Sequence, residues 1–396
     1  MNTYDIDISF FQSIQSMRAE DWDACACPES PNRRPLNIFS THRFLLALEK
    51  SKSVGEGTGW IPHYIVAKSK GTIIAVAPLY LKYHSQGEYV FDHNWANAFE
   101  GAGGQYYPKL QISIPFTPAT GKRFLTKPGW EQAGSNALIK GAIHLAEQNN
   151  LSSIHITFCT DSEIDIGKEN DLLYRTSQQF HWKNNSYNSF DCFLESLSSR
   201  KRKNIKKERK LANQFGGKIE VLQGTQIEEK HWDSFWLFYQ DTGIKKWGTP
   251  YLTRDFFKEV QKNLLDDTLL VLAEINGRYV AGALNFIGQD TLYGRYWGCV
   301  EDYPFLHFEL CYYRAIDFAI SNNLKVVEAG AQGTHKLARG YLPVAVKSLH
   351  WINNKNLRNA ISAYLDSERA AVEEGNEVLT SFAPYKNLVK KTISNN

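Results

Sequence analysis

Residues 292–351 read LYGRYWGCVEDYPFLHFELCYYRAIDFAISNNLKVVEAGAQGTHKLARGYLPVAVKSLHW, and the rest of the chain is organised around them. Among the aromatic and small residues of this stretch lie Arg295, His307, Glu309, Glu328, Gln332, His335, Lys336, Arg339 and His350. A plain core does not carry such groups, because a buried polar group without a partner costs about 1–3 kcal/mol. Polar groups at this density in apolar surroundings are typical of a functional site.

The composition is that of a globular protein with room for two domains. The chain has 396 residues, of which 43% are hydrophobic and 22% are charged. The formal net charge is only +3, so the protein as a whole is not an electrostatic nucleic-acid binder. Any basic patch must therefore be local. The aromatic share of 13% favours clefts lined by rings.

Cysteine usage and the N-terminus bear on the compartment. The six cysteines form no CxxC pair, which fits a reducing compartment and speaks against a disulfide framework. The N-terminus, MNTYDIDISFFQSIQ, lacks a basic start followed by an apolar run, so we expect no secretory signal. The longest apolar runs, such as residues 73–81, fall far below the roughly 18 residues that span a bilayer. We expect a cytoplasmic protein with at most peripheral membrane contact.

Apolar periodicity and turn residues predict the order of the elements. Helices are expected at 41–54, 135–150 and 308–323, and strands at 63–84 (two runs around Lys70-Gly71), 151–158, 269–288 (a pair), 292–300 and 324–330. The first 35 residues predict a short lead-in helix and a loop that contains proline. Residues 87–124, dense in Tyr, Phe, Gly and Pro, predict binding loops on a rigid scaffold.

Two pairs of segments indicate an internal repeat. IVAKSKGTIIAVAPLYL (65–81) aligns with VLAEINGRYVAGALNFI (271–287), a strand pair around a turn in each case. AIHLAEQNNLSSIHITF (142–158) aligns with AIDFAISNNLKVVEAGA (315–331), and both carry Asn-Asn-Leu where a helix gives way to a strand. The period is too long for a solenoid unit, so these matches predict a duplicated α/β domain.

Between the two copies lies a strongly basic segment, residues 190–218. Eight of the twelve residues from Arg200 to Leu211 are basic, against one acid, Glu208. One interpretation is a solvated helix face with a few apolar anchors. The other is a helix that binds a polyanion such as a lipid diphosphate, a nucleotide or tRNA. The residues that we expect to contact phosphate are Arg200, Arg202, Lys203, Lys206 and Arg209.

Several long segments carry a resemblance to a known family. FSTHRFLLALEKSKSV, PLYLKYHSQGEYVFDHNWANAF, QFHWKNNSYNSFDCFLESLSSRKRKNIKKERK, YGRYWGCVEDYPFLHFELCYYRAIDFAI and EAGAQGTHKLARGYLP resemble the FemAB-like acyltransferase family, in its branch of peptidoglycan-biosynthesis-type predicted N-acyltransferases. The similarity covers roughly Asn37 to Trp351, and HFELCYY and GAQGxHKxxRG are its most specific patterns. One departure is Thr334, where relatives carry an acid between Gly and His. If that acid takes part in the chemistry of the relatives, this chain lacks it.

The resemblance implies an α/β fold with mixed sheets, made of two tandem GNAT-like (N-acetyltransferase) domains. The lead-in would occupy residues 1–36 and the first GNAT-like domain residues 37–189. A basic helical connector, residues 190–218, would precede the second domain with its C-terminal helical tail, residues 219–396.

The resemblance further implies transfer of an acyl or aminoacyl group to an amine. FemAB-type enzymes take the group from aminoacyl-tRNA and pass it to a peptidoglycan precursor, so the implied partners are a donor, an amine acceptor and tRNA, with no bound cofactor. The phosphate loop Q/R-x-x-G-x-G/A of acetyl-CoA-dependent GNAT enzymes is not evident before either helix. An acyl-CoA or acyl-carrier-protein dependent N-acyltransferase is the first alternative. A non-catalytic module that recognises cell-wall precursors is the second.

Acyl transfer needs a deprotonated amine, a donor carbonyl held in line and hydrogen-bond donors for the developing oxyanion. Backbone N–H groups supply such donors where a parallel sheet splays open, and we expect that opening between residues 292–300 and 324–330. His335 is the best candidate base, because the unperturbed pKa of histidine lies near neutrality. Glu309 is either a base or an acid placed favourably at a helix N-terminus. Glu328 either binds substrate or pairs with Arg295 or Arg339.

The remaining candidates are expected to bind substrate. In the second copy they are Arg295, Trp297, His307, Gln332, Lys336 and Arg339, with solvated loop charges as the alternative for the last two. In the first copy they are His84, Glu88, Trp95, Tyr106, Tyr107, Lys109 and Arg123, with a packing role equally open for the two tyrosines. His350 is more simply a core histidine. No spacing of His, Cys or carboxylates predicts a metal site.

Overall fold

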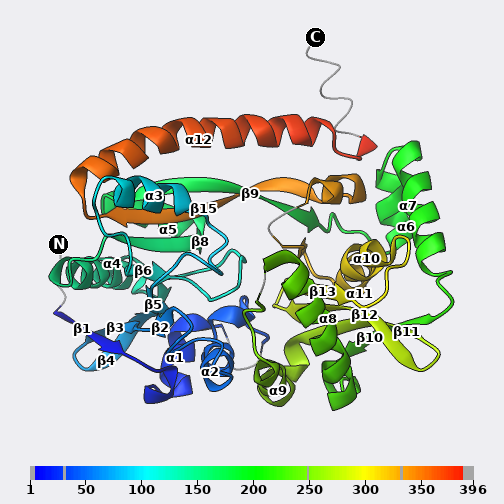
Figure 1. Cartoon of the computed structure of the whole chain (residues 1–396), viewed down its shortest axis with the longest axis horizontal. Coiled ribbons are helices and arrows are strands. Elements are labelled where there is room, and N and C mark those ends of the chain that lie inside the picture. The colour runs from blue at the N-terminus through cyan, green and yellow to red at the C-terminus, as the bar shows by residue number, and fades with distance from the viewer. Residues whose placement is uncertain (1–4, 30–32, 248, 331–332, 387–396) are drawn as a thin grey trace, which may run out of the picture. The chain divides into compact units, whose positions relative to one another are not determined.

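The computed structural model describes residues 5–29, 33–247, 249–330 and 333–386, without the side chains of 244–247. The chain forms two compact units, a first unit of residues 1–177 and 345–372 and a second unit of residues 178–344 and 373–396 (Figure 1). Because residues 345–372 cluster with the first unit, the units are not two consecutive stretches of chain. The boundaries expected for the GNAT-like domains stay a prediction. Among the described helices, none combines the length and apolarity needed to cross a bilayer.

The first unit contains a small antiparallel sheet in the order β1-β3-β4-β7. Its strands are β1 (Ile6–Phe11), β3 (Tyr64–Ser69), β4 (Thr72–Ala77) and β7 (Leu125–Thr126). The strand pair around Lys70-Gly71 is confirmed as β3 and β4. Strand β1 was not expected, because a short edge strand gains its stability from the partner β3 and not from its own sequence. The expected lead-in helix follows it as α1 (Ala19–Ala26).

A second sheet of the first unit has the order β15-β8-β6-β5-β2. Its members are β2 (Trp60–Pro62), β5 (Leu79–Lys82), β6 (Lys109–Ile112), β8 (Ser153–Cys159) and β15 (Leu342–Ile352). The helices of the unit are α2 (His42–Lys50), α3 (His93–Gly101), α4 (Glu131–Gln148) and α5 (Asp161–Glu169), and α12 (Lys355–Ser381) begins in it. The expectation of loops alone at 87–124 was wrong, since this segment contains α3 and β6. Apolar residues of α4, such as Leu138 and Ala142, share a buried core with Ile154 and Ile156 of β8.

The second unit is built on the strand order β10-β11-β12-β13-β14-β9, in which only β13 and β14 are parallel. Its strands are β9 (Leu173–Lys183, which begins in the first unit), β10 (Lys218–Gln223), β11 (Thr268–Ile275), β12 (Arg278–Ile287), β13 (Thr291–Cys299) and β14 (Val326–Glu328). Its helices are α6 (Phe190–Ser196), α7 (Ser199–Ala212), α8 (Glu229–Trp247), α9 (Arg254–Asn263), α10 (Leu306–Phe308) and α11 (Arg314–Ser321). The strands expected at 269–288, 292–300 and 324–330 are confirmed. Figure 1 shows α7 beside α10 and α11.

The internal repeat is visible in the backbone. Asn150 after α4 and Asn323 after α11 both adopt the left-handed conformation, with φ of 51° and 55°. The next residue, Leu151 or Leu324, donates its N–H to the carbonyl five residues back, at 2.9 and 2.8 Å. Asparagine tolerates this helix-ending conformation, which explains why Asn-Asn-Leu recurs. Each helix leads into a strand that pairs in parallel with an earlier strand, β8 with β6 and β14 with β13, although β7 lies between β6 and α4 in the chain.

Candidate functional site

The two parallel strands of the second unit pair over a short stretch. Register pairs join β13 to β14 at Thr291–Val326, Leu292–Val327 and Tyr293–Glu328, and β14 then ends. Strand β13 continues to Cys299. We call the place where β13 continues beyond its last register pair with β14 the opening between the two strands.

A β-bulge lies at the start of this opening. Gly294 pairs with Asn285 and Tyr296 pairs with Leu284, which leaves Arg295 as an extra residue on β13. Bulges re-aim side chains and end strand pairing, and they are common beside active sites. A Cβ at position 294 would lie 3.2 Å from the carbonyl oxygen of Glu328, so glycine keeps the two strands close where they part. The guanidinium of Arg295 lies over the ring of Tyr296, 5.2 Å from its centroid.

The helix after β13 is interrupted by a π turn. Helix α10 runs directly into the π turn Glu309–Tyr313, and α11 continues from Arg314. Single π turns inside helices occur frequently at functional sites, because the extra residue shifts side chains out of the regular helical pattern. Here the turn carries Glu309, Tyr312 and Tyr313, of which only Glu309 was singled out from the sequence.

Tyr312 and His335 form a hydrogen-bonded pair, with 2.8 Å between the phenol oxygen and Nε2. His335 is exposed and lies in the 3₁₀ helix Thr334–Arg339. Burial raises the pKa of Tyr312, so its phenol stays protonated at neutral pH. Gly333 precedes this helix with φ of 114°, and a Cβ there would lie 2.6 Å from Cε1 of His335. Glycine is thus required both by the backbone and by the space that the imidazole occupies.

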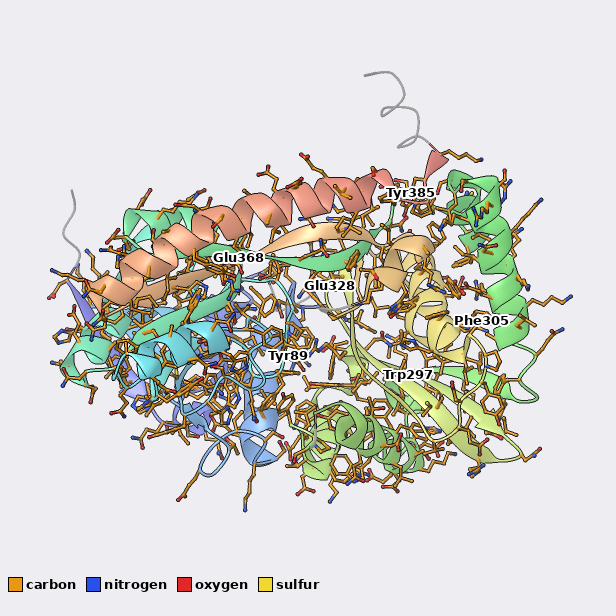
Figure 2. All side chains as sticks on the ribbon, turned by 45° about the horizontal axis from the view of Figure 1, so that its top comes forward. Tyr89, Trp297, Phe305, Glu328, Glu368 and Tyr385 are labelled. Atoms are coloured by element: carbon orange, nitrogen blue, oxygen red, sulfur yellow. The ribbon has the colours of Figure 1, made fainter. Side chains whose placement is uncertain are left out.

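Aromatic rings surround this pair. The ring of His307 lies 4.9 Å from that of Trp297 and 5.4 Å from that of Tyr312, and the ring of Phe308 lies 5.6 Å from that of His335. In Figure 2, Trp297 and Glu328 come from the two strands that border the opening, and Phe305 from the turn that leads into α10. The structure therefore brings together His307, Trp297 and His335, as expected, and adds Tyr312.

Lys336 and Arg339 are buried, with 1% and 6% of their surfaces exposed, so they are not solvated loop charges. The amine of Lys336 donates to the carbonyl of Gly330 at 3.0 Å, and burial lowers the pKa of Lys336 to about 8. Arg339 donates from Nη1 to the carbonyl of His335 at 2.7 Å, and its guanidinium lies 3.4 Å from the centroid of Phe308. Both side chains hold the turn that presents His335. Gln332 lies outside the described residues.

Glu328 is 9% exposed and closes the paired part of the two strands. It lies in register with Tyr293 on one side and with His181 of β9 on the other, so the three side chains share one face of the sheet. The pKa of His181 is lowered to about 4 by burial and by the charges of Lys183 and Lys336, which leaves the imidazole neutral at pH 7. Glu328 therefore contributes a carboxylate at the edge of the opening.

Glu309 is fully buried in an ion-pair cluster. Arg209 donates to both carboxylate oxygens, from Nε at 3.1 Å and from Nη2 at 3.0 Å, and Nε of Arg314 lies 2.9 Å from Oε1. Arg209 also donates to Asp317 at 2.6 Å. With both oxygens taken and no exposed surface, Glu309 is placed to anchor α7 to the π turn. It is not placed to meet a substrate amine.

Helix α7 presents most of its basic residues to solvent. Arg200, Lys203, Lys206, Lys207 and Lys210 are exposed and Arg202 is half-buried, while Ile205 and Ala212 pack inward. Of the five residues predicted to bind phosphate, Arg209 alone is committed to carboxylates inside the protein. Lys206 makes one ion pair with Asp191, at 3.3 Å between exposed groups, and such surface pairs are weak.

In the first unit, the predicted residues gather in a buried network. The amine of Lys109 donates to Ser85 and Glu88, both at 2.8 Å, and to Asp92 at 2.5 Å. Tyr106 donates to Asp92 at 2.7 Å, while Tyr107 and Ser85 share a hydrogen bond of 2.7 Å. Burial raises the pKa of Glu88 to about 7 and lowers that of Lys82, 3.7 Å from it, to about 7. His84 hydrogen-bonds to the carbonyl of Thr58 at 3.0 Å.

A pair of buried histidines extends this network, of which His350 was expected as a core histidine and His155 was not singled out from the sequence. His155 on β8 and His350 on β15 share a hydrogen bond of 2.7 Å between their Nδ1 atoms, and the ring of Trp95 lies 5.0 Å from that of His350. Burial lowers the pKa of His155 to about 3 and that of His350 well below its ordinary value. The only signal in the sequence was the alternation of each histidine with buried strand residues, which also fits a core histidine.

In the first unit, Arg123 lies beside the end of the equivalent strand pair. The last register pair between β6 and β8 is Ile112–Ile156. The next carbonyl of β8, that of Thr157, accepts a hydrogen bond of 2.8 Å from Nε of Arg123. Arg123 is fully buried and also donates to the carbonyl of Ala119 at 2.6 Å. Its guanidinium thus satisfies carbonyls of β8 and of the loop just before Arg123.

Comparisons with known proteins concern the family and the fold of the chain. The model of the FemAB-like family, described as peptidoglycan biosynthesis/recognition, matches residues 13–387. The crystal structure of FemX is similar to 90% of this chain over 100% of its own length, with a TM-score of 0.54 and 13% identity. A tandem GNAT protein from the clavulanic acid biosynthesis pathway matches over 88% of this chain and 98% of its own, with a TM-score of 0.46 and 10% identity. A search of curated proteins finds no match.

Proposed function

The chain belongs to the FemAB-like family, and on that premise we propose that it is an N-acyltransferase with one working site, in the second unit. The observation that carries the proposal is the opening between β13 and β14, with the Tyr312–His335 pair on the turn and helix beside it. In the first unit, the buried Arg123 is bound at the end of the corresponding strand pair. The mixed α/β fold, shared with FemX, supports the same assignment.

In the proposed reaction the donor's acyl carbonyl lies beside β13 at the opening, and backbone N–H groups there stabilise the oxyanion. The acceptor amine attacks the carbonyl carbon, a C–N bond forms, and the bond from carbon to the leaving oxygen or sulfur breaks. His335 takes a proton from the amine through Nδ1 and passes one through Nε2 to Tyr312. Tyr312 gives its phenolic proton to the leaving group. The proton released by the amine is thereby returned to the departing alcohol or thiol.

For the donor we propose an aminoacyl-tRNA. The exposed basic face of α7 offers a row of cations to a phosphate backbone, and clustering them costs stability through mutual repulsion. The segment ahead of α10 carries Glu301, Asp302 and Pro304. Its acids repel a diphosphate such as that of CoA, so this helix start is a poor site for an acyl-CoA donor. An acyl-CoA donor is the alternative, and its phosphates would use only part of the basic face of α7.

For the acceptor we propose an amine of a cell-wall precursor, in keeping with the description of the family. Glu328 is the carboxylate at the edge of the opening and suits an acceptor ammonium before it loses its proton. Thr334 supplies no carboxylate, so in this proposal His335 and Tyr312 move the proton without an acid at that position.

Label transfer from two donor pools tests the proposal. Purified protein is mixed with a bacterial extract and either tRNA charged with a labelled amino acid or labelled long-chain acyl-CoA. Label that moves from tRNA to a cell-wall precursor supports the proposal, and label that moves only from the thioester replaces the donor. Absence of transfer from both pools, with retained affinity for a precursor, contradicts an enzyme and favours a binding module.

A further inference from the structure

Helix α7 contains one acid among its basic residues, and the proposed function does not use it. Glu208 stands between Lys207 and Arg209, and its side chain is 19% exposed. Its carboxylate accepts hydrogen bonds from Nη2 of Arg339, at 3.0 and 2.9 Å, and from the phenol of Tyr313. A residue on the predicted polyanion helix is therefore bound to the two elements that carry the proton-transfer pair.

Arg339 links Glu208 to the turn of His335. Its Nη2 is held by Glu208, while its Nη1 donates to the main-chain carbonyl of His335 at 2.7 Å. The guanidinium plane lies on the ring of Phe308, which fixes it from a third side. A planar guanidinium held at these three places leaves the turn from His335 to Arg339 little freedom to rotate.

Tyr313 links Glu208 to the other half of the pair. Tyr313 follows Tyr312 in the π turn and is fully buried, and its phenol donates to Glu208. Glu208 is thus an acceptor shared by the turn that holds His335 and the turn that holds Tyr312. Its hydrogen bonds to the two turns come from Arg339 and Tyr313.

We propose that Glu208 is a positioning residue that sets the geometry between Tyr312 and His335. The inference rests on the proposed function, in which this pair moves the proton. A carboxylate is needed because a lysine or arginine at 208 would face the charge of Arg339, and a shorter or neutral side chain would release one of the two turns. Displacement of a reacting group by about 1 Å costs on the order of 100-fold in rate, so a remote tether of this kind has a measurable effect.

Three variants separate positioning from mere stability. Glu208→Gln keeps the side-chain shape but leaves Arg339 without a countercharge. The double variant Glu208→Gln with Arg339→Met removes that unpaired charge and still lacks the tether. Glu195→Gln, an exposed acid on α6, is the matched control. We expect Glu208→Gln to lower kcat about tenfold or more with KM within about twofold, and the double variant to recover stability without recovering kcat.

A second readout does not depend on turnover. The ¹⁵N spectrum of the ring nitrogens of His335, assigned by loss of its signals in His335→Ala, reports the hydrogen bond to Tyr312. In Glu208→Gln and the double variant we expect the Nε2 signal to move toward that of a solvent-exposed histidine. Signals that superpose on those of the parent protein would overturn the inference, as would an increase in KM with unchanged kcat. If the parent protein transfers no label, the proposed function fails, and the spectrum still decides whether Glu208 positions His335.

Discussion

At the scale of single residues, the sequence predicted which side chains lie together only where they are close in the chain. His335, Lys336 and Arg339 lie within five positions of one another, so their proximity followed from the pattern GAQGTHKLARG. Glu309 lies 100 positions from Arg209, and only the fold brings them together. The sequence left the role of Glu309 open between a base and a favourably placed acid. The buried ion pairs favour an anchor.

Tyr312 is the partner of His335 that the sequence did not single out, and its removal tests the pair. In Tyr312→Phe the imidazole loses its hydrogen bond and the leaving group loses its proton donor, so we expect kcat to fall about tenfold with KM unchanged. The control is Tyr364→Phe, which removes an exposed phenol on α12. Steady-state transfer rates measure both variants. Equal kcat values in Tyr312→Phe and the parent protein would remove Tyr312 from the mechanism.

Glu309 gives a prediction about stability. Glu309→Gln leaves Arg209 and Arg314 without the carboxylate that pairs with both. Removing one partner of a buried ion pair costs about 3–5 kcal/mol, and we expect the free energy of unfolding to fall by about 3 kcal/mol. Urea denaturation at pH 7 measures it, with Glu195→Gln as the control. Stability equal to that of the control, together with lost turnover, would restore Glu309 to the chemistry.

At the scale of elements, the repeated turns were the most predictable part. Lys70-Gly71 and Asn276-Gly277 both adopt left-handed conformations at a strand turn. Such a turn depends on the conformational preferences of adjacent residues, so the sequence predicts it directly. The sequence did not predict strands β1 and β6 or helix α3. These elements are short, and contacts with the rest of the fold stabilise them more than their own sequence does. The basic segment predicted one helix, while the structure has α6 and α7 separated at Leu197-Ser198.

The exposed face of α7 gives a prediction at the same scale. In the double variant Lys203→Glu and Lys207→Glu, two exposed cations become anions. We expect tRNA affinity to fall at least about tenfold at moderate salt, and the slope of log K against log salt to become shallower by roughly 1.5. Filter binding at several salt concentrations measures both quantities. Lys140→Glu, on α4, is the control, and an unchanged slope in the double variant would contradict the role of α7.

At the scale of the whole molecule, the sequence predicted two copies of one fold, and the structure explains why one is proposed to work. In the first unit, Arg123 donates to main-chain carbonyls, and the buried charges of Lys82, Glu88, Asp92 and Lys109 pair with one another. In the second unit, β13 continues beyond its last register pair with β14. The sequence indicated the candidate residues of both copies as substrate-binding. Residue types alone do not distinguish a buried network of paired charges from a site that binds substrate.

The buried histidines predict how stability depends on pH. The folded pKa of His155 is about 3 and that of His350 is also lowered, so between pH 6.5 and 3 the unfolded chain binds more protons. The contribution of the two histidines to the free energy of unfolding is therefore complete above pH 6.5. It falls as the pH is lowered, by up to about 1.4 kcal/mol per pH unit for each histidine. The pKa of Glu88 is raised to about 7, so between pH 7 and 4.5 the folded protein binds more protons at this residue than the unfolded chain. This effect offsets the loss of stability that one of the two histidines causes in that range.

Urea denaturation at pH 7.0 and 5.5 measures this dependence, and we expect a lower midpoint at pH 5.5. His144→Ala, which removes an exposed histidine, serves as the control and keeps the same dependence. A midpoint that is equal or higher at pH 5.5 would mean that the two histidines are already charged in the folded protein.

The most direct test of the central claim is the single-turnover rate of label transfer by the purified protein and by His335→Ala. The donor is the one that the pool experiment identifies, and circular dichroism confirms that the variant is folded. The account predicts that transfer by His335→Ala is at least about 100-fold slower, because the attacking amine loses its proton acceptor. Equal rates would place the chemistry away from the opening between β13 and β14 and would contradict the account.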